Sequence, residues 1–180
     1  MKISFGARYI NSIPVLKKAD VDYQRQNIAF VELDMHDKND LNALTKTSDR
    51  WGDESYLSVA KDSMEQGVKE GKRHLYMATT QKKSFEKLDE SKVLGAVVFD
   101  EGKSQNHIEL LQVEPNNLAK AKKTANWARV GSSIVKNLQT MFSNKPMTVF
   151  SAGDAKGFYE KTGFVQEAGN KSGFAYIWNA

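Results

Sequence analysis

Phe158-Tyr159-Glu160-Lys161-Thr162-Gly163-Phe164, near the C-terminal end of the 180-residue chain, is the stretch from which the fold is worked out. Asp154 precedes it and can cap the start of a helix, and the apolar positions between Asp154 and Gly163 recur at a spacing that places them on one helical face. Gly163 suits the left-handed position that often follows a helix. The segment therefore predicts a short amphipathic helix followed by a strand, with Tyr159 on the apolar face.

The rest of the chain alternates between strand and helix patterns. Strands are expected at 27–35, 74–80, 93–99, 107–113, 147–151, 164–166 and 174–178, and helices after Asp37, at 56–71 and at 131–143. Asp100-Glu101-Gly102-Lys103 is expected to be a hairpin turn. Residues 1–26 are expected to add an edge strand or a covering segment. This order predicts an α/β fold with a mixed, mostly antiparallel central sheet and helices on both faces.

Length and composition favour one domain over residues 1–180, since 40% of the residues are apolar. The absence of cysteine excludes disulfides and thiolate chemistry, and the three histidines do not have a metal-ligand spacing. No apolar run approaches the roughly 20 residues needed to cross a bilayer, so the sequence predicts a cytoplasmic protein without a membrane partner. The net charge of +4 is compatible with phosphorylated cofactors. Nucleic acid is not favoured, because Trp127 is the one aromatic residue among the clustered lysines.

The segment from Val113 to Ser133 has the pattern of a phosphate site. A strand that ends near Val113 is followed by a loop and by a helix that opens at Arg129-Val130-Gly131-Ser132-Ser133. The first N–H groups of a helix, together with its dipole, attract anions. The same residues are also good helix-start residues, so this segment alone leaves both interpretations open.

Three segments in order carry a family resemblance: Ile108-Glu109-Leu110-Leu111-Gln112-Val113, Gly131-Ser132-Ser133-Ile134-Val135, and the closing FYEKTGF. Over roughly residues 28–178 the chain resembles the GCN5-related N-acetyltransferase (GNAT) superfamily. The resemblance implies an acyltransferase that uses acetyl-CoA as co-substrate. It implies that the backbone of the strand binds pantetheine, that the helix start binds the pyrophosphate, and that the closing phrase completes the site. The implied cofactor-binding residues are Leu111, Gln112, Val113, Arg129, Val130, Gly131, Ser132, Ser133 and Phe158.

The same resemblance implies the catalytic residues. Tyr159 would protonate the departing CoA thiolate as a general acid, although its place on the apolar face also fits a core residue. Glu109 or His107 would take the proton of the amine, and the two-residue period of a strand places both on one face. A solvated Glu109 and a His107 beside the turn are the structural alternatives. The acceptor would be a primary amine on a small molecule or a protein, and the protein could form a homodimer.

Several positions depart from the family pattern. Arg129 stands where a glycine is usual, Ala152 stands where an asparagine is frequent, and residues 117–125 form a lysine-rich insertion. These departures motivate a second hypothesis, in which the chain is a catalytically silent acyl-CoA-binding or regulatory module. The helices between Asp37 and Gly71 are expected to shape the acceptor pocket, and their acids beside aromatics would suit a cationic amine.

Overall fold

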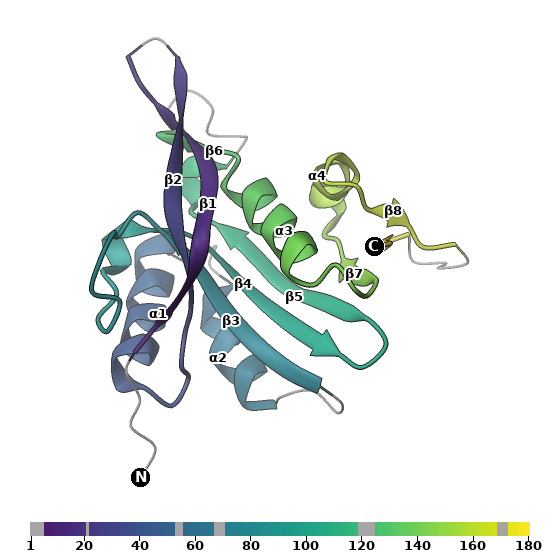
Figure 1. Cartoon of the computed structure of the whole chain (residues 1–180), viewed down its shortest axis with the longest axis horizontal. Coiled ribbons are helices and arrows are strands. Elements are labelled where there is room, and N and C mark those ends of the chain that lie inside the picture. The colour runs from purple at the N-terminus through teal and green to yellow at the C-terminus, as the bar shows by residue number, and fades with distance from the viewer. Residues whose placement is uncertain (1–5, 21, 53–55, 67–70, 119–124, 169–172) are drawn as a thin grey trace.

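A single sheet of nine strands organises the computed structural model of the chain (Figure 1). The structure describes residues 6–20, 22–52, 56–66, 71–118, 125–168 and 173–180. All neighbouring strands are antiparallel except β5 and β7, which are parallel. In spatial order the strands are β6 (Trp127–Ala128), β1 (Arg8–Lys18), β2 (Tyr23–Glu32), β3 (Gly71–Thr79), β4 (Val93–Gly102), β5 (Asn106–Val113), β7 (Met147–Phe150), β9 (Ala175–Trp178) and β8 (Val165–Gln166).

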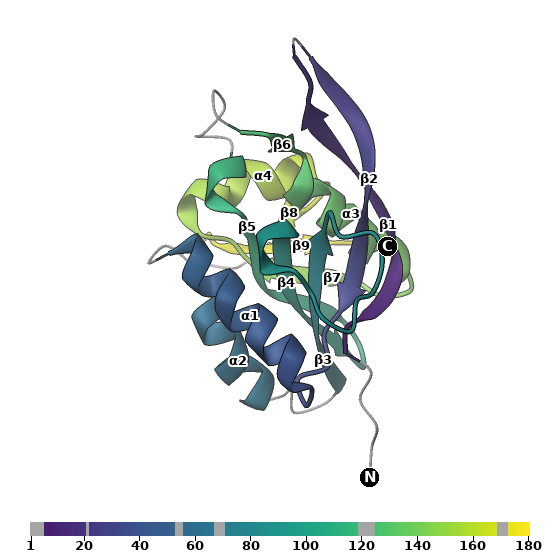
Figure 2. The ribbon, with the colours of Figure 1, turned by 90° about the vertical axis from the view of Figure 1, so that its left-hand side faces the viewer.

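Helices cover both faces of this sheet (Figure 2). On one face, α1 (Lys38–Trp51) and α2 (Leu57–Gln66) pack on an apolar cluster that includes Leu75 and Val98. On the other face, α3 (Val130–Met141) and α4 (Lys156–Lys161) pack on a second cluster around Tyr76 and Val97. In the described connections, short 3-10 helices lie at Glu90–Lys92, Pro115–Asn117 and Gly153–Ala155. The mixed sheet covered on both faces confirms the predicted fold class.

Local patterns explain where most elements begin and end. Asp37 caps α1 as expected, because its side chain accepts the backbone N–H groups of Asn39 and Asp40. Gly163 adopts a positive φ of 92° after α4, which a residue with a Cβ rarely does. Within the described parts of the chain, no helix is long and apolar enough to pass through a membrane.

Two local predictions were wrong. The expected turn at Asp100-Glu101-Gly102-Lys103 is mostly strand, since β4 continues to Gly102 and only the residues from 103 to 105 connect it to β5. Cross-strand pairing of Asp100 and Glu101 with β3 and β5 extends the strand past its polar residues. Asp154 makes no capping hydrogen bond to α4, because it lies in a 3-10 turn and Ala155 occupies the cap position.

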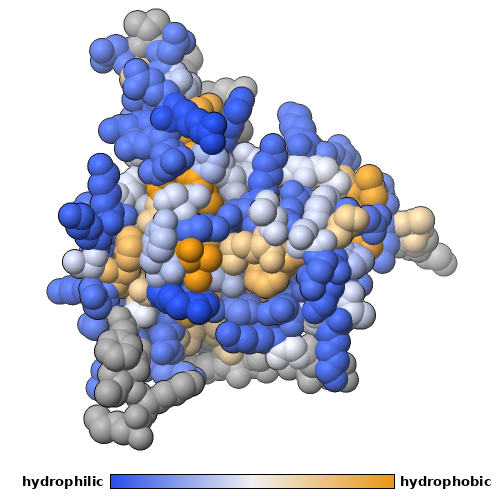
Figure 3. Space-filling view, viewed as in Figure 1, coloured by the Kyte–Doolittle hydropathy of each residue, from blue (hydrophilic) through white to orange (hydrophobic). Residues whose placement is uncertain are grey.

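Residues 8–32 form a long hairpin of β1 and β2, in the region where an edge strand or a covering segment was expected. β1 pairs with β2 from Arg8 to Lys18, and the far end of this hairpin projects from the body of the molecule (Figure 1). The projecting end is clad mainly in hydrophilic side chains (Figure 3). On the side of β1 away from β2, the two-residue strand β6 pairs with β1, Leu16 with Ala128 and Lys17 with Trp127. The sheet edge is therefore shared between the N-terminal strand and the segment that leads into α3.

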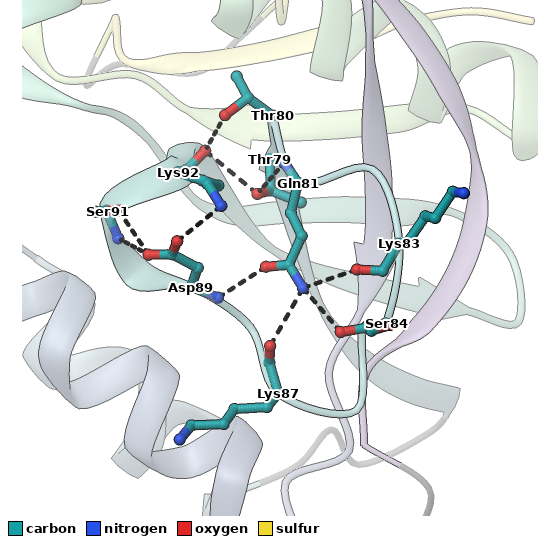
Figure 4. Close-up of polar contacts among 9 residues, drawn as sticks. All are labelled: Thr79, Thr80, Gln81, Lys83, Ser84, Lys87, Asp89, Ser91 and Lys92. Atoms are coloured by element: carbon teal, nitrogen blue, oxygen red, sulfur yellow. Dashed lines mark hydrogen bonds and ion pairs between the residues drawn. The ribbon is translucent and has the colours of Figure 1, made fainter.

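The connection between β3 and β4 is organised by one side chain, Gln81 (Figure 4). Its amide nitrogen donates to the carbonyl oxygens of Lys83, Ser84 and Lys87, at 2.8 to 3.2 Å. Its amide oxygen accepts the backbone N–H of Asp89 at 2.8 Å. One glutamine thus satisfies backbone groups of a loop that has no regular structure of its own.

A cluster of charged side chains joins β1, β2 and β3, with His74 and Glu32 largely buried and Arg8 exposed. Glu32 on β2 accepts from Nδ1 of His74 on β3 at 2.5 Å and is also bound by Arg8. Burial raises the pKa of Glu32, but hydrogen bonds and charges from His74 and Arg8 outweigh it and lower the pKa to about 2. Glu32 therefore stays ionised through the ordinary pH range.

Candidate active site

The site forms where β5 and β7 part. The two strands pair at Asn106, His107 and Ile108 of β5, and no pairing is recorded beyond Ile108. On the other edge of β5, Leu110 faces Val98 and Ile108 faces Phe99, so that Glu109 is left as the extra residue of a β-bulge. A bulge bends its strand and redirects a side chain. The β5 strand therefore leaves β7 at Glu109, which is one of the two residues that the family resemblance implied as the base, the other being His107.

The parting of the strands leaves backbone groups of β5 without a neighbouring strand. Glu114 N–H donates to the Leu94 carbonyl of β4 at 2.9 Å. Because antiparallel pairing alternates along a strand, Gln112 also directs its backbone groups to β4, and Leu111 and Val113 direct theirs to the opposite edge. The Gln112 side chain accepts the backbone N–H of Tyr56 at 2.8 Å. Of the three strand residues predicted to bind pantetheine, Leu111 and Val113 thus offer backbone groups to the opening.

A cavity of about 560 Å³ occupies this opening. Its charged lining residues are Asp62 of α2 and Glu109 of β5, both acidic. Tyr56 and Phe150 lie at its mouth with 69% and 68% of their surface exposed. The residues that line it are Tyr56, Val59, Asp62, Ile108, Glu109, Leu110, Leu111, Val149, Phe150, Ala152, Ala155 and Tyr159.

Tyr159 of α4 lines this cavity while most of its ring is buried. The ring packs edge-on against Phe158 and Phe164, with centroids 5.0 and 5.6 Å away. Burial raises the pKa of Tyr159 to about 12. The phenol therefore keeps its proton at neutral pH and can donate it. Tyr159 is therefore a core residue that also lines the cavity, so its surroundings fit both alternatives, a core residue and a general acid.

Glu109 and His107 are neighbours in the structure. Nε2 of His107 lies 3.6 Å from Oε2 of Glu109, and Arg73 of β3 lies 3.9 Å from the same carboxylate oxygen. Burial lowers the pKa of His107 below its ordinary value, although the charges of Glu109 and Asp100 oppose this shift. His107 is consequently neutral at pH 7. Glu109 is half-exposed toward the cavity, with 44% of its side chain accessible.

The start of α3 forms the second part of the site. Arg129 precedes the helix with a left-handed φ of 64°, which is uncommon for a residue with a side chain. Ser133 N–H is the first to find an intrahelical carbonyl, that of Arg129, at 2.9 Å. The N–H groups of Val130, Gly131 and Ser132 have no carbonyl within the helix to bind. They belong to residues 129–133, the segment that the family resemblance implied would cradle a pyrophosphate.

Close packing surrounds these N–H groups. A Cβ on Gly131 would lie 3.2 Å from Val113 and 3.3 Å from Phe158, so glycine permits the approach of α3 to β5 and α4. Ser133 donates its hydroxyl to the carbonyl of Pro14 and so anchors α3 to β1. A second cavity, of about 490 Å³, lies beside the helix start. Its lining includes Tyr23, Val113, Trp127, Arg129, Gly131 and Phe158.

Comparisons with known proteins were made by sequence and by structure. The sequence matches no protein-family model and no curated protein. By structure, the chain is similar to PaiA N-acetyltransferase from Thermoplasma acidophilum, solved in complex with coenzyme A, with 14% identity, a TM-score of 0.53, and 86% of this chain and 100% of that chain covered. A candidate acetyltransferase from Exiguobacterium sp. 255-15 gives a TM-score of 0.54 at 14% identity, covering 86% and 94% of the two chains. The chain has the GNAT fold.

A third solved structure with this fold is an acyl-CoA N-acyltransferase from Pseudomonas aeruginosa. It is 14% identical with a TM-score of 0.50, and the match covers 83% of this chain and 96% of that chain. At this level of identity the likeness concerns the GNAT fold, and the roles of side chains rest on the geometry of this chain. In this fold β5 and α4 line the first cavity, and β5, α4 and the start of α3 line the second.

Sequence reasoning missed several residues around the GNAT opening. Arg73 and Asp100 carry no local signal, because they come from strands that are adjacent only in the folded sheet. Thr148 contacts His107 from β7, and Tyr23 contributes from the N-terminal hairpin. Most of the lysine-rich insertion, residues 119–124, lies outside the described residues.

Proposed function

We propose that the protein transfers an acetyl group from acetyl-CoA to a primary amine. The observation that carries the proposal is the parting of β5 and β7 at the Glu109 bulge. It leaves the outward backbone groups of Leu111 and Val113 without a neighbouring strand, with Leu111 at the cavity that Glu109 and Tyr159 line and Val113 at the cavity beside the start of α3. The PaiA structure from Thermoplasma acidophilum, which shares the fold, contains coenzyme A. We therefore propose acetyl-CoA as the acyl donor.

The donor would lie along β5 with its pyrophosphate at α3. Pantetheine amides would hydrogen-bond the outward N–H and C=O groups of Leu111 and Val113, as an added strand does. The free N–H groups at Val130 to Ser132 and the helix dipole would bind the pyrophosphate. Arg129 is exposed beside them and can pair with a phosphate oxygen. The apolar rings of Trp127 and Phe158 would cover the adjoining cavity.

Catalysis would come from positioning and from proton transfer. Glu109 takes one proton from the acceptor ammonium, and the free amine then attacks the thioester carbon. As the tetrahedral intermediate collapses, the C–S bond breaks and Tyr159 donates a proton to the sulfur. The nitrogen loses its second proton, which passes through solvent to the Tyr159 phenolate and restores the phenol, and Glu109 gives up the first proton, so that amide, free CoA thiol and one released proton are the products. Both proton carriers are described side chains at the cavity.

The cavity favours a cationic acceptor. Its charged lining residues, Asp62 and Glu109, are both acidic, and the exposed rings of Tyr56 and Phe150 lie beside them. Carboxylates and aromatic faces attract an alkylammonium group. An acceptor that carried a carboxylate near its amine would be repelled here. We therefore place amines with a positive or neutral tail ahead of free amino acids.

Two measurements test the proposal. Isothermal titration with acetyl-CoA should show binding, and a thiol-release assay with alkylamines, polyamines and lysine peptides should show turnover. Tyr159→Phe and Glu109→Gln should each lower kcat about 100-fold, in the range of general acid–base catalysis. Tyr9→Phe, an exposed tyrosine outside this cavity, is the matched control and should leave kcat unchanged. If the protein binds acetyl-CoA but acetylates none of the amines, it is a silent acyl-CoA-binding module. If it does not bind acetyl-CoA, both the acetyltransferase and the silent binding module are refuted.

A further inference from the structure

A buried ion pair lies directly behind Glu109. Arg73 of β3 and Asp100 of β4 face each other across the sheet, and Nε and one terminal nitrogen of Arg73 bind the two Asp100 oxygens at 2.5 and 2.6 Å. Only 10% of the Arg73 side chain and 12% of the Asp100 side chain are exposed. Removing two charges from water is costly, and apolar residues often stabilise such a position equally well. Stability alone is therefore a weak explanation for a charged pair at this position.

The same guanidinium reaches a second carboxylate. The terminal nitrogen of Arg73 lies 3.9 Å from Oε2 of Glu109, while its other contacts fix it to Asp100. Glu109 is otherwise a half-exposed side chain on a bulge. An arginine that is itself fixed in a fork geometry gives this carboxylate a defined place. That place also lies 3.6 Å from Nε2 of His107.

The His107 ring is oriented from its other side. Thr148 of β7 donates its hydroxyl to the carbonyl of Asn106 at 3.2 Å, and the same oxygen lies 2.9 Å from Nδ1 of His107. Since the hydroxyl proton is already used, the Thr148 oxygen accepts from His107, which places the imidazole proton on Nδ1. Nε2 then carries the lone pair and faces Glu109. The edge of Phe150, 5.6 Å away between centroids, packs against the ring.

Resting on the proposed acetyltransferase function, we propose that Arg73, fixed by Asp100, is a positioning residue that sets Glu109 for proton transfer to His107. Glu109 first takes a proton from the acceptor ammonium and becomes a neutral acid. Its O–H bond then breaks as a bond to Nε2 of His107 forms, which restores the carboxylate and gives an imidazolium. The imidazolium releases this proton to solvent, because 23% of the His107 side chain is exposed. The groups that face His107 are Glu109, Asp100, Arg73 and Thr148.

The test separates positioning from folding. Arg73→Met alone leaves the Asp100 charge buried without its partner and should lower Tm. The double variant Arg73→Met/Asp100→Leu replaces both charges by apolar groups and should recover most of the lost Tm. If Arg73 positions Glu109, the double variant keeps kcat about 10- to 100-fold below wild type, the scale of a displaced catalytic group. Its Kd for acetyl-CoA should stay within about 2-fold of wild type, since neither residue lines the cofactor path.

The matched control is Lys92→Met, which removes the exposed ion pair with Asp89 on the distant β3–β4 connection and should leave kcat unchanged. Recovery of kcat together with Tm in the double variant would show that the pair is structural only, and would overturn the proposal. A second measurement needs no turnover. Long-range ¹H–¹⁵N correlation spectra of the wild-type protein should show neutral His107 with its proton on Nδ1, and Thr148→Val should abolish this preference.

A His107 proton on Nε2 would overturn the proposal, because Nε2 could not then accept from Glu109. The two readouts also distinguish the failure of this inference from the failure of the proposed function. Absence of thiol release by the wild-type protein with every amine refutes the proposed function. In that case the His107 spectra still decide whether Nε2 of His107 is free to accept a proton from Glu109.

Discussion

Replacing Gly95 with alanine tests how tightly the start of α3 is set against the sheet. Gly95 lies on β4 opposite Val113, and a Cβ added there would lie 2.8 Å from Cδ1 of Ile134 and 3.0 Å from Cγ1 of Val130. Both contacts are closer than a packed core accepts. The methyl group must therefore displace the side chains of Ile134 and Val130, and both belong to the first part of α3, whose N–H groups we propose bind the pyrophosphate.

Overpacking of this kind costs about 1 to 3 kcal/mol, and the gain from restricting the unfolded chain offsets about 0.4 to 1 kcal/mol of it. For a domain of this size, 1 kcal/mol corresponds to roughly 2 to 4 °C in Tm, so Gly95→Ala should lower Tm by several degrees. A shift of the helix start should also weaken acetyl-CoA binding by about 10-fold, comparable to the loss of one charge-assisted hydrogen bond. Differential scanning calorimetry and isothermal titration measure the two effects.

Gly157→Ala on α4 is the control, since a Cβ there meets nothing within 4 Å. Alanine is the better helix former by about 1 kcal/mol, so this variant should keep or raise Tm and bind acetyl-CoA normally. If Gly95→Ala matched wild type in both Tm and Kd, the start of α3 would not depend on its contact with β4. The account of how the sheet places these N–H groups would then be wrong.

Three further predictions follow from individual side chains. The activity of the wild-type protein should persist to alkaline pH and fall only as Tyr159, with its pKa of about 12, loses its proton. Asp62→Asn should lower kcat/KM for diamines about 5-fold and leave that for neutral-tailed monoamines unchanged, as expected for a partly exposed charge pair, and added salt should reduce the difference. Because the pKa of Glu32 is lowered to about 2 in the folded state, its contribution of about 2 to 3 kcal/mol is present above pH 5 and is lost as pH falls toward 2. Urea unfolding should therefore show that Glu32→Gln is less stable than wild type at pH 7 and changes less between pH 5 and 2.

The sequence predicted those parts of the fold that depend on short-range patterns. The caps and apolar spacing around Asp37 and in residues 131–143 depend on neighbours within a few residues, and the corresponding helices are present. The turn between β4 and β5 was misplaced because pairing with two neighbouring strands keeps Asp100 and Glu101 extended, against their turn propensity. Strand β6 was missed because a two-residue strand exists only by virtue of its partner.

For the candidate site as well, the sequence predicted some residues and could not predict others. Glu109, His107 and Tyr159 could be proposed from the order of motifs along the chain, and the structure brings Glu109 and Tyr159 to one cavity with His107 beside Glu109. The bulge that frees Glu109 from regular pairing leaves no trace in the local sequence. Arg73 could not be predicted either, since its relation to Glu109 passes through two strand pairings that only the folded sheet creates.

The pairing of β6 with β1 connects two segments that are far apart in the sequence. The amide of Lys18 donates to the carbonyl of Asn126 at 2.8 Å, and β6 leads within one residue to the start of α3. A ligand seated on α3 therefore also restrains the outer edge of the N-terminal hairpin. When a ligand occupies the start of α3, hydrogen–deuterium exchange of the Lys18 amide should therefore slow. Lys18 would report this occupancy although it precedes α3 by more than a hundred residues in the sequence.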